Sequence, residues 1–152
     1  MAQLDEVDRR IVEALRADGR ASMRTLAEAL HISRANVYAR VQRLEHDGVI
    51  TGYTATIDPQ RYGLGVAAYV YVNISQHSWK AVQARILAMP EVDHAALVSG
   101  SHDLVLLVRT RDTTSLRELV LTRLQGMPEI TSTETVLIFD ELPTTPRVSS
   151  LP

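Results

Sequence analysis

Residues 26–48, LAEALHISRANVYARVQRLEHDG, predict two short helices joined by a tight turn. Apolar side chains recur every three or four positions on both sides of residues 31–33, which is the period of one helix face. We therefore predict helices over 23–30 and 34–47. Because only three residues separate them, the arrangement is typical of a helix-turn-helix.

Serine and glycine residues mark the ends of these helices. Ser22 and Ser33 each precede a helix, where a serine side chain accepts a hydrogen bond from a free amide of the first turn. Gly48 follows the second helix and ends it. His31 stands where this turn often holds glycine, which is a departure from the common pattern.

An earlier helix is predicted over residues 5–17. Its apolar side chains recur at helical spacing, at Leu4, Val7, Ile11, Val12 and Leu15. Gly19 is expected to end it in the left-handed conformation. The three helices predict a helix-turn-helix domain over residues 1–50.

A β pattern begins after Gly48. Residues 49–57, VITGYTATI, are rich in β-branched residues, so we predict a strand here, and a β linker over 51–64. From 65 to 142 strands and helices alternate in the order βαββαβ, which is the ferredoxin-like arrangement. The predicted strands are 66–75, 92–98, 104–111 and 130–142, and the predicted helices are 78–89 and 114–127.

The predicted fold class is therefore α+β, a three-helix (winged) helix-turn-helix domain joined by a β linker to a βαββαβ ferredoxin-like domain. Met23, Trp79 and Met89 are interpreted as core residues. Residues 143–152, PTTPRVSSLP, predict a flexible tail. One sheet face takes both helices, and the other carries apolar residues that nothing in the chain covers, which predicts a homodimer interface.

The composition excludes several classes of protein. The 152 residues include no cysteine, which excludes disulfides, thiolate zinc sites and a cysteine nucleophile. We see no signal peptide and no apolar run long enough to cross a bilayer, so we expect a cytoplasmic protein that does not bind membranes. The net charge is −2, yet residues 20–43 hold five arginines and one acid, Glu28. A locally basic segment favours binding to nucleic acid.

Three stretches carry a resemblance to a known family. LDEVDRRIVEALRADGRAS at 4–22, LAEALHISRANVYARVQRLEHDGVITGYTATIDP at 26–59 and VSGSHDLVLLV at 98–108 resemble the Lrp/AsnC (leucine-responsive and asparagine-responsive) regulators. With the order of elements, the match covers nearly the whole chain up to Leu142. The resemblance implies dimers that assemble further into tetramers or octamers, and an amino acid or related effector bound between dimers.

Residues of the 34–47 helix and of the start of the 23–30 helix are candidates to contact double-stranded DNA, because in a helix-turn-helix the N-terminal half of the second of these helices enters the major groove. Candidates for contact with bases are Arg34, Asn36 and Tyr38, with Ala35 and Ala39 near thymine methyl groups. Candidates for contact with phosphates or for holding the helix on DNA are Ser22, Arg24, Ser33, Arg40 and Arg43.

A structural interpretation stays open for each of these side chains. The arginines can form surface ion pairs instead, and for Arg40 the available acids are Glu45 and Asp8. Tyr38 can pack against a neighbouring helix. The concentration of positive charge on one helix nevertheless favours DNA binding for the set as a whole.

The turn Ser99-Gly100-Ser101-His102-Asp103 is the candidate effector site. Its composition alone is that of an ordinary hairpin turn. The functional interpretation, which the resemblance favours, is a site for a zwitterion: amides near Gly100 hold a carboxylate, Asp103 holds an ammonium group, and His102 closes over the ligand. Polar groups from a neighbouring subunit are expected at Thr131, Ser132 and Thr133.

Two other classes of function stay open. One is a ferredoxin-like enzyme acting on small molecules, but the five histidines lack metal-ligand spacing, and neither a Ser/His/Asp set nor a phosphate loop is apparent. The other is a protein-interaction module with a winged-helix adaptor. We therefore expect a sequence-specific transcription regulator, without catalytic activity, metal or cofactor, whose oligomeric state or DNA affinity responds to an amino acid.

Overall fold

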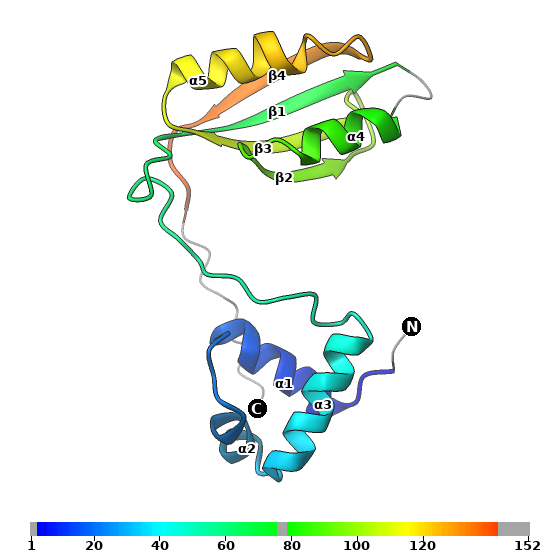
Figure 1. The fold of residues 1–152 in the computed structure, drawn as a ribbon, viewed down its shortest axis with the longest axis vertical. Coiled ribbons are helices and arrows are strands. Elements are labelled where there is room, and N and C mark those ends of the chain that lie inside the picture. Colours follow the sequence, from blue (N-terminus) through cyan, green and yellow to red (C-terminus); the bar gives the residue numbers. More distant parts are fainter. Residues whose placement is uncertain (1–2, 76–78, 143–152) are drawn as a thin grey trace. The chain divides into compact units, whose positions relative to one another are not determined.

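A computed structural model describes residues 3–75 and 79–142 of the chain (Figure 1). These residues form two compact units, 3–56 and Ile57–Leu142, each with its own hydrophobic core. The segments 1–2, 76–78 and 143–152 lie outside the described residues, so the flexible tail predicted over 143–152 stays a prediction.

The first unit consists of three helices, α1 (Glu6–Ala17), α2 (Met23–Leu30) and α3 (Arg34–His46). Ser22 and Ser33 cap α2 and α3 as predicted, each accepting a hydrogen bond from a backbone amide of the first turn. Asp5, which was predicted to lie inside the first helix, caps α1 in the same way. The apolar stripes of the three helices meet in one core, whose buried members are Ile11, Leu15, Leu26, Ala27, Leu30, Val37, Val41 and Leu44. Burying a side chain of this size contributes about 1.5–3 kcal/mol, so this core holds α3 in place.

The turn between α2 and α3 contains an unusual backbone conformation. His31 has φ 56° and ψ 40°, the left-handed region that glycine adopts more readily. The Ile32 amide donates to the Ala27 carbonyl across this turn at 3.1 Å. The position where glycine is common therefore does require a left-handed residue, and His31 adopts that conformation.

Two predicted features of the first unit are wrong. α1 ends at Ala17, and the residue that caps it, Asp18, has an extended backbone with φ −140°. Gly19 is not among the residues with positive φ, so no left-handed cap forms there. No strand is found among residues 49–57, and none of the described residues of this unit forms a wing beside α3. A strand requires a neighbour to accept and donate its backbone hydrogen bonds, and within the described chain this segment has none.

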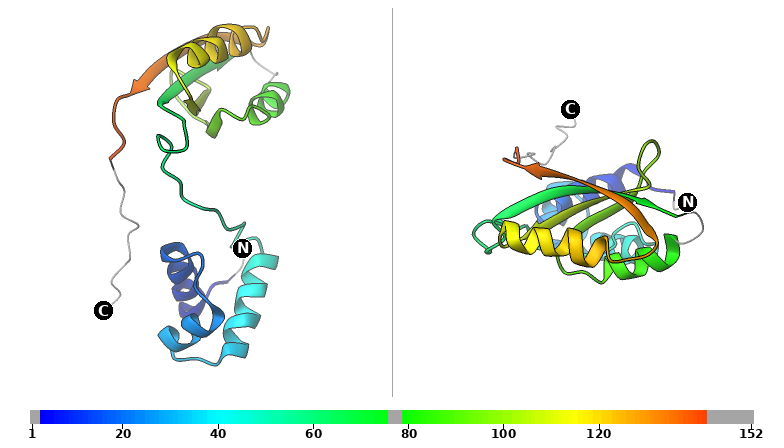
Figure 2. Two further views of the ribbon diagram at one scale, coloured as in Figure 1. Left: turned by 60° about the vertical axis from the view of Figure 1, so that its left-hand side comes forward. Right: turned by 90° about the horizontal axis from the view of Figure 1, so that it is seen from above.

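The second unit is a four-stranded antiparallel sheet with helices packed on one face. Its strands are β1 (Val66–Ile74), β2 (Val92–Leu97), β3 (Leu104–Thr110) and β4 (Ile130–Ile138), in the order β2-β3-β1-β4. The helices are α4 (Trp79–Leu87) and α5 (Thr113–Arg117), the latter continued by a π-helical segment over Glu118–Leu124. Figure 2 shows both helices beneath the sheet when it is viewed along its edge.

The core of this unit lies between the helices and the inner face of the sheet. Alternate residues of the two central strands are buried there, Ala68, Val70, Val72, Leu104, Leu106 and Val108, opposite Val82, Ile86, Leu119 and Leu124 of the helices. Met89 is buried, as predicted, and Met23 packs against the core of the first unit. Trp79 is 36% exposed, so its placement in the core is wrong: it is the first residue of α4, one turn before the first buried side chain of that helix.

The outer face of the sheet is apolar and uncovered by the described residues of the chain. Tyr69 on β1 lies opposite Leu107 on β3 and Val136 on β4, so one apolar row crosses three strands. Tyr69 is 41% exposed and Val136 is 44% exposed. A contiguous apolar row at a sheet surface is typical of an interaction site.

Candidate DNA-binding helix and effector-binding turn

The N-terminal half of α3 presents the predicted base-contacting side chains to solvent. Val37 and Val41 anchor the inner side of the helix, with 0% and 3% exposure. Arg34, Asn36 and Tyr38 are exposed, and Tyr38 is 56% exposed. Tyr38 therefore does not pack inside the three-helix unit, which was its alternative interpretation. Ala35 and Ala39 are exposed as well.

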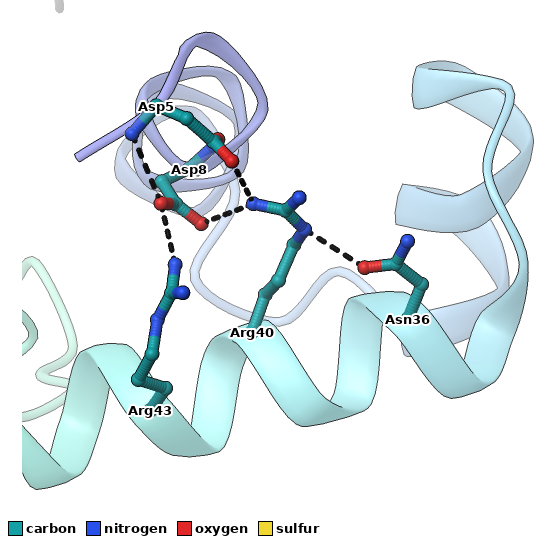
Figure 3. A network of polar contacts seen from close by, with 5 residues as sticks. All are labelled: Asp5, Asp8, Asn36, Arg40 and Arg43. Carbon is teal, nitrogen blue, oxygen red and sulfur yellow. Dashed lines mark hydrogen bonds and ion pairs between the residues drawn. The ribbon is translucent and has the colours of Figure 1, made fainter.

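Two aspartates of α1 and its cap hold two arginines of α3, as Figure 3 shows. The Asp8 side chain is 1% exposed and accepts from Arg40 Nη1 at 2.7 Å and from Arg43 Nη2 at 2.5 Å. Arg40 Nη1 also donates to Asp5 Oδ2 at 2.6 Å. These bonds, between residues more than 30 positions apart, fix the rotation of α3 about its own axis relative to α1.

Asp5 and Arg40 have pKa values shifted in the directions that their pairing dictates. The pKa of Asp5 is lowered, first by the Asp8 backbone amide that donates to its carboxylate and then by Arg40. The pKa of Arg40 is raised, because its guanidinium donates to Asp5 and Asp8. Both groups are therefore charged near neutral pH, and the cluster is an ion pair network.

Arg40 makes one further contact, along α3. Its Nε donates to Asn36 Oδ1 at 2.8 Å. Of the two acids considered as partners of Arg40, the structure selects Asp8, because Glu45 instead accepts from the hydroxyl of Tyr53 at 2.9 Å. These contacts support a positioning role for Arg40, while direct contact with phosphate stays a prediction.

The other candidates for DNA contact differ in whether their polar groups already have partners within the protein. Arg24 pairs with Glu28 at 2.8 Å on the exposed side of α2, and Ser22 is engaged in capping that helix, with its Oγ accepting from the Thr25 amide at 3.0 Å. Arg34 forms no ion pair with any of the described residues. Arg24 and Arg34 line the same shallow hollow, of about 480 Å³, at the turn between α2 and α3.

The predicted effector turn connects β2 to β3 at the end of the sheet. Leu97 pairs with Leu104 across it, so residues 98–103 do form a hairpin connection. Gly100 has φ 127°, a conformation open to glycine and strained for other residues. Ser99 and Ser101 are exposed on either side of it.

Asp103 and His102 reach from this turn toward β1. Asp103 Oδ2 accepts from the Ile74 backbone amide at 2.9 Å. The ring of His102 lies 5.1 Å from that of Tyr71, and its Nε2 lies 3.3 Å from Glu134 Oε2 on β4. The alternation of residues on β4 did not single out Glu134 beforehand, because its contact with His102 reaches across β1, which lies between β3 and β4 in the sheet.

The β4 candidates lie on the other side of the end of β1. Ser132 Oγ accepts from Asn73 Nδ2 at 3.0 Å, and Thr133 Oγ1 accepts from Gln125 Nε2 at 2.8 Å. Thr131 is exposed at an irregularity in the pairing of β4 with β1. Each of the two bonded hydroxyls keeps a free hydrogen with which to donate.

Within residues 3–75 and 79–142, no group of three or more His, Asp or Glu side chains is placed to hold a metal ion. In the same residues, no helix combines the length and the apolar character required to cross a membrane.

Two family models match the chain, each over one of its units. Residues 4–45 match the AsnC-type helix-turn-helix domain, and residues 67–148 match the Lrp/AsnC ligand binding domain. The chain belongs to the Lrp/AsnC family of transcription regulators. This confirms the resemblance that the sequence carries and the assignment of an α+β fold with an N-terminal helix-turn-helix.

Individual members of the Lrp/AsnC family are similar along nearly the whole chain. The HTH-type transcriptional regulator AldR of Mycolicibacterium smegmatis is 36% identical over 142 residues, which cover 91% of this chain and 83% of AldR. The Mycobacterium tuberculosis leucine response regulatory protein LrpA has a solved structure with 32% identity and TM-score 0.83, covering 93% of this chain and 96% of its own. A Neisseria meningitidis transcriptional regulator in complex with L-Met has 25% identity and TM-score 0.88, covering 99% and 97%.

Proposed function

We propose that this Lrp/AsnC regulator reads duplex DNA with the N-terminal half of α3. The observation that carries the proposal is the division of α3 into a buried side, Val37, Val41 and Leu44, and an outer side on which Arg34 is exposed without an acidic partner among the described residues. A side chain that forms no ion pair in the free protein retains its donors for guanine.

Phosphate contacts surround this reading face. The hollow that Arg34 lines is also lined by Arg24 of α2 and by Ser33, which caps α3. Ser22 caps α2. Arg43 is half exposed and binds Asp8 with a single Nη, so its other donors are available to a phosphate. Arg40, which is held by two aspartates, positions the helix.

Two copies of the chain associate through the outer face of the sheet. The apolar row Tyr69, Leu107 and Val136 is the surface that a second copy covers. A two-fold symmetric dimer presents two α3 helices, which matches operators built of two inverted half-sites. Association of dimers into tetramers or octamers is part of the same proposal.

The effector is an amino acid bound at residues 99–103. Asp103 provides the negative charge for an α-ammonium group, and the glycine conformation at Gly100 lets backbone amides approach a carboxylate. Thr131, Ser132 and Thr133 of a neighbouring subunit complete the site. The relative solved with L-Met supports an amino acid as the class of ligand.

A selection of bound sequences from random duplex DNA tests the DNA-binding proposal. We expect an enriched sequence with two inverted half-sites, retained at low salt and released at high salt, because binding to phosphates releases counterions. Retention that is insensitive to sequence and salt, together with capture of a specific protein, would instead favour the protein-interaction module.

Calorimetric titration with each of the common amino acids tests the effector proposal. Asp103→Asn keeps an oxygen that accepts from the Ile74 amide but removes the charge. We expect at least one amino acid to bind the wild type and to bind Asp103→Asn at least tenfold more weakly, as loss of a charge-assisted hydrogen bond predicts. Equal binding by both proteins removes Asp103 from the site, and conversion of any titrated compound into a product would favour the enzyme.

A further inference from the structure

A hydrogen bond from Arg40 fixes which end of the Asn36 side-chain amide is the oxygen and which is the nitrogen. The atom of Asn36 that lies 2.8 Å from Arg40 Nε must be the oxygen, because Nε–H of a guanidinium only donates hydrogen bonds. The amide NH₂ group of Asn36 therefore points away from Arg40. Among the described residues, Asn36 Nδ2 has no hydrogen-bond partner.

The group that holds Asn36 is itself immobilised. The Arg40 side chain is 22% exposed, and its Nη1 donates to Asp5 at 2.6 Å and to Asp8 at 2.7 Å. Asp8 is fully buried and also accepts from the Asp5 backbone amide, so it cannot move without opening the N-terminus of α1. A chain of bonds thus runs from the cap of α1 through Arg40 to the reading face of α3, as Figure 3 shows.

This chain of bonds limits what Asn36 can recognise. An asparagine that reads adenine with two hydrogen bonds accepts from the N6 amino group with its oxygen and donates to N7 with its nitrogen. In this protein the oxygen is directed along the helix to a cation, which also polarises the amide and strengthens its NH₂ as a donor. The oxygen keeps a second lone pair. Because it is turned toward Arg40 and already bound to a cation, it is a poorer acceptor for a base, whereas the NH₂ group is free to donate.

We propose that Asn36 acts as a hydrogen-bond donor in base recognition: its NH₂ group recognises an acceptor on a base edge, and its oxygen, which Arg40 holds, contributes little to recognition of the N6 amino group of adenine. The acceptors available in the major groove are N7 of either purine, O6 of guanine and O4 of thymine. The proposal rests on the proposed DNA-reading role of α3 and defines the chemistry that one of its residues reads.

The test begins with a duplex that the wild-type protein selects from random DNA. Comparing the wild type with Asn36→Ala across single base-pair changes identifies the pair that Asn36 contacts. At that pair, 7-deazapurine removes N7, 6-thioguanine weakens the acceptor at O6 and 4-thiothymine weakens the acceptor at O4, whereas purine in place of adenine removes only the N6 amino group. Affinity is measured at one fixed salt concentration.

We expect loss of the acceptor to weaken wild-type binding roughly five- to tenfold, the effect of one uncharged hydrogen bond, and removal of the amino group to change it less than twofold. Asn36→Ala should respond to neither modification. If loss of the amino group weakens wild-type binding as much as loss of the acceptor, the proposal is overturned. It is also overturned if no base pair distinguishes Asn36→Ala from the wild type, whereas a protein that binds no duplex at all overturns the proposed function first.

A second variant tests whether Arg40 is the cause. Arg40→Lys keeps a positive charge for Asp5 and Asp8 but removes the Nε that holds Asn36. We expect this variant to become sensitive to the N6 amino group of adenine, since the amide can then offer its oxygen. Arg16→Lys, at the exposed Arg16–Glu13 pair of α1, is the matched control and should behave as wild type. An Arg40→Lys variant with the wild-type acceptor-only profile would show that Arg40 does not fix the amide.

Discussion

His31 shows how a single backbone conformation enters the stability of the helix-turn-helix. A residue with a Cβ in the left-handed region costs about 1–2 kcal/mol relative to the right-handed one, and glycine does not bear this cost. Replacing His31 with glycine would remove this cost, but part of the benefit is offset because glycine loses more chain entropy on folding. Glycine is therefore common in this turn of a helix-turn-helix for a physical reason, and this chain departs from the common pattern.

The first prediction follows from this conformation. We expect His31→Gly to stabilise the three-helix unit by about 0.5–1 kcal/mol, measured by hydrogen exchange of the α2 and α3 amides. Gly48→Ala is the matched opposite change, because Gly48 has φ 68° and no atom lies within 4 Å of an added Cβ, so only strain acts. Gly48→Ala should destabilise the three-helix unit and speed hydrogen exchange of the same amides. If both substitutions change the exchange rates in the same direction, left-handed strain does not explain the changes.

Asp5 gives the second prediction, which concerns pH. Its pKa is lowered in the folded protein from the ordinary value of 3.8, by the Asp8 amide and then by Arg40. A carboxylate with a lowered folded pKa contributes stability that is fully present above its unfolded pKa and is lost as the pH falls through the folded value. We therefore expect the first unit to lose stability below about pH 4.

Asp5→Asn should flatten this pH dependence in the amides of α1 without changing that of α5. Asp112, which caps α5 and has its own pKa lowered mainly by the Ser115 amide, provides the matched variant: Asp112→Asn should act on α5 alone. Hydrogen exchange between pH 3 and pH 6 distinguishes the two. An acid sensitivity of α1 that survives Asp5→Asn would assign it to another group.

At the scale of elements, the docking of α3 on α1 depends on a buried charge. Asp8 compensates Arg40 and Arg43, and removing one partner of a buried pair commonly costs 3–5 kcal/mol. Arg43 is half exposed and regains water, so we expect Asp8→Asn to destabilise the unit by about 2–3 kcal/mol. Glu13→Gln, at an exposed ion pair of the same helix, should cost less than about 0.5 kcal/mol. Urea unfolding measures both costs. If they are similar, the buried Asp8 charge stabilises the unit no more than an exposed ion pair does.

Features of the elements that depend on neighbours in the sequence were predictable, and those that depend on packing were not. Caps such as Ser22 and Ser33 and the apolar period of α3 are local, and the structure has them where the sequence predicts. The strand over 49–57 was predicted from β propensity, but propensity does not supply a pairing partner. The sequence left Asp8 and Glu45 open as partners of Arg40 and named no partner for Arg43. Asp8 lies more than 30 positions from both arginines, so only the packing of α1 on α3 selects these pairs.

At the scale of the whole molecule, the outer face of the sheet should decide the oligomeric state. Tyr69 is central to an apolar row, and a charge there cannot be buried without a large desolvation penalty. We expect Tyr69→Glu to shift the protein from dimer toward monomer in sedimentation velocity experiments at micromolar concentration. Leu121→Glu, at an exposed leucine of the helical side, is the control. A Tyr69→Glu protein that sediments as wild type would place the interface elsewhere.

In the proposed dimer both α3 helices contact DNA. Contacts with phosphates and contacts with bases should then differ in how they change the salt dependence of binding. Each phosphate contact contributes about 0.9 to the slope of log affinity against log salt, so Arg43→Ala should lower that slope by about one per subunit and weaken all sequences alike. Arg34→Ala should reduce the ratio of the affinities for operator and random duplex, because a guanine contact worth about 1–3 kcal/mol is lost at each half-site. Gel-shift titrations from low to high salt on both duplexes measure the two effects. If Arg43→Ala instead reduces discrimination between the two duplexes and leaves the slope unchanged, Arg43 contacts a base. The proposed orientation of α3 in the groove is then wrong.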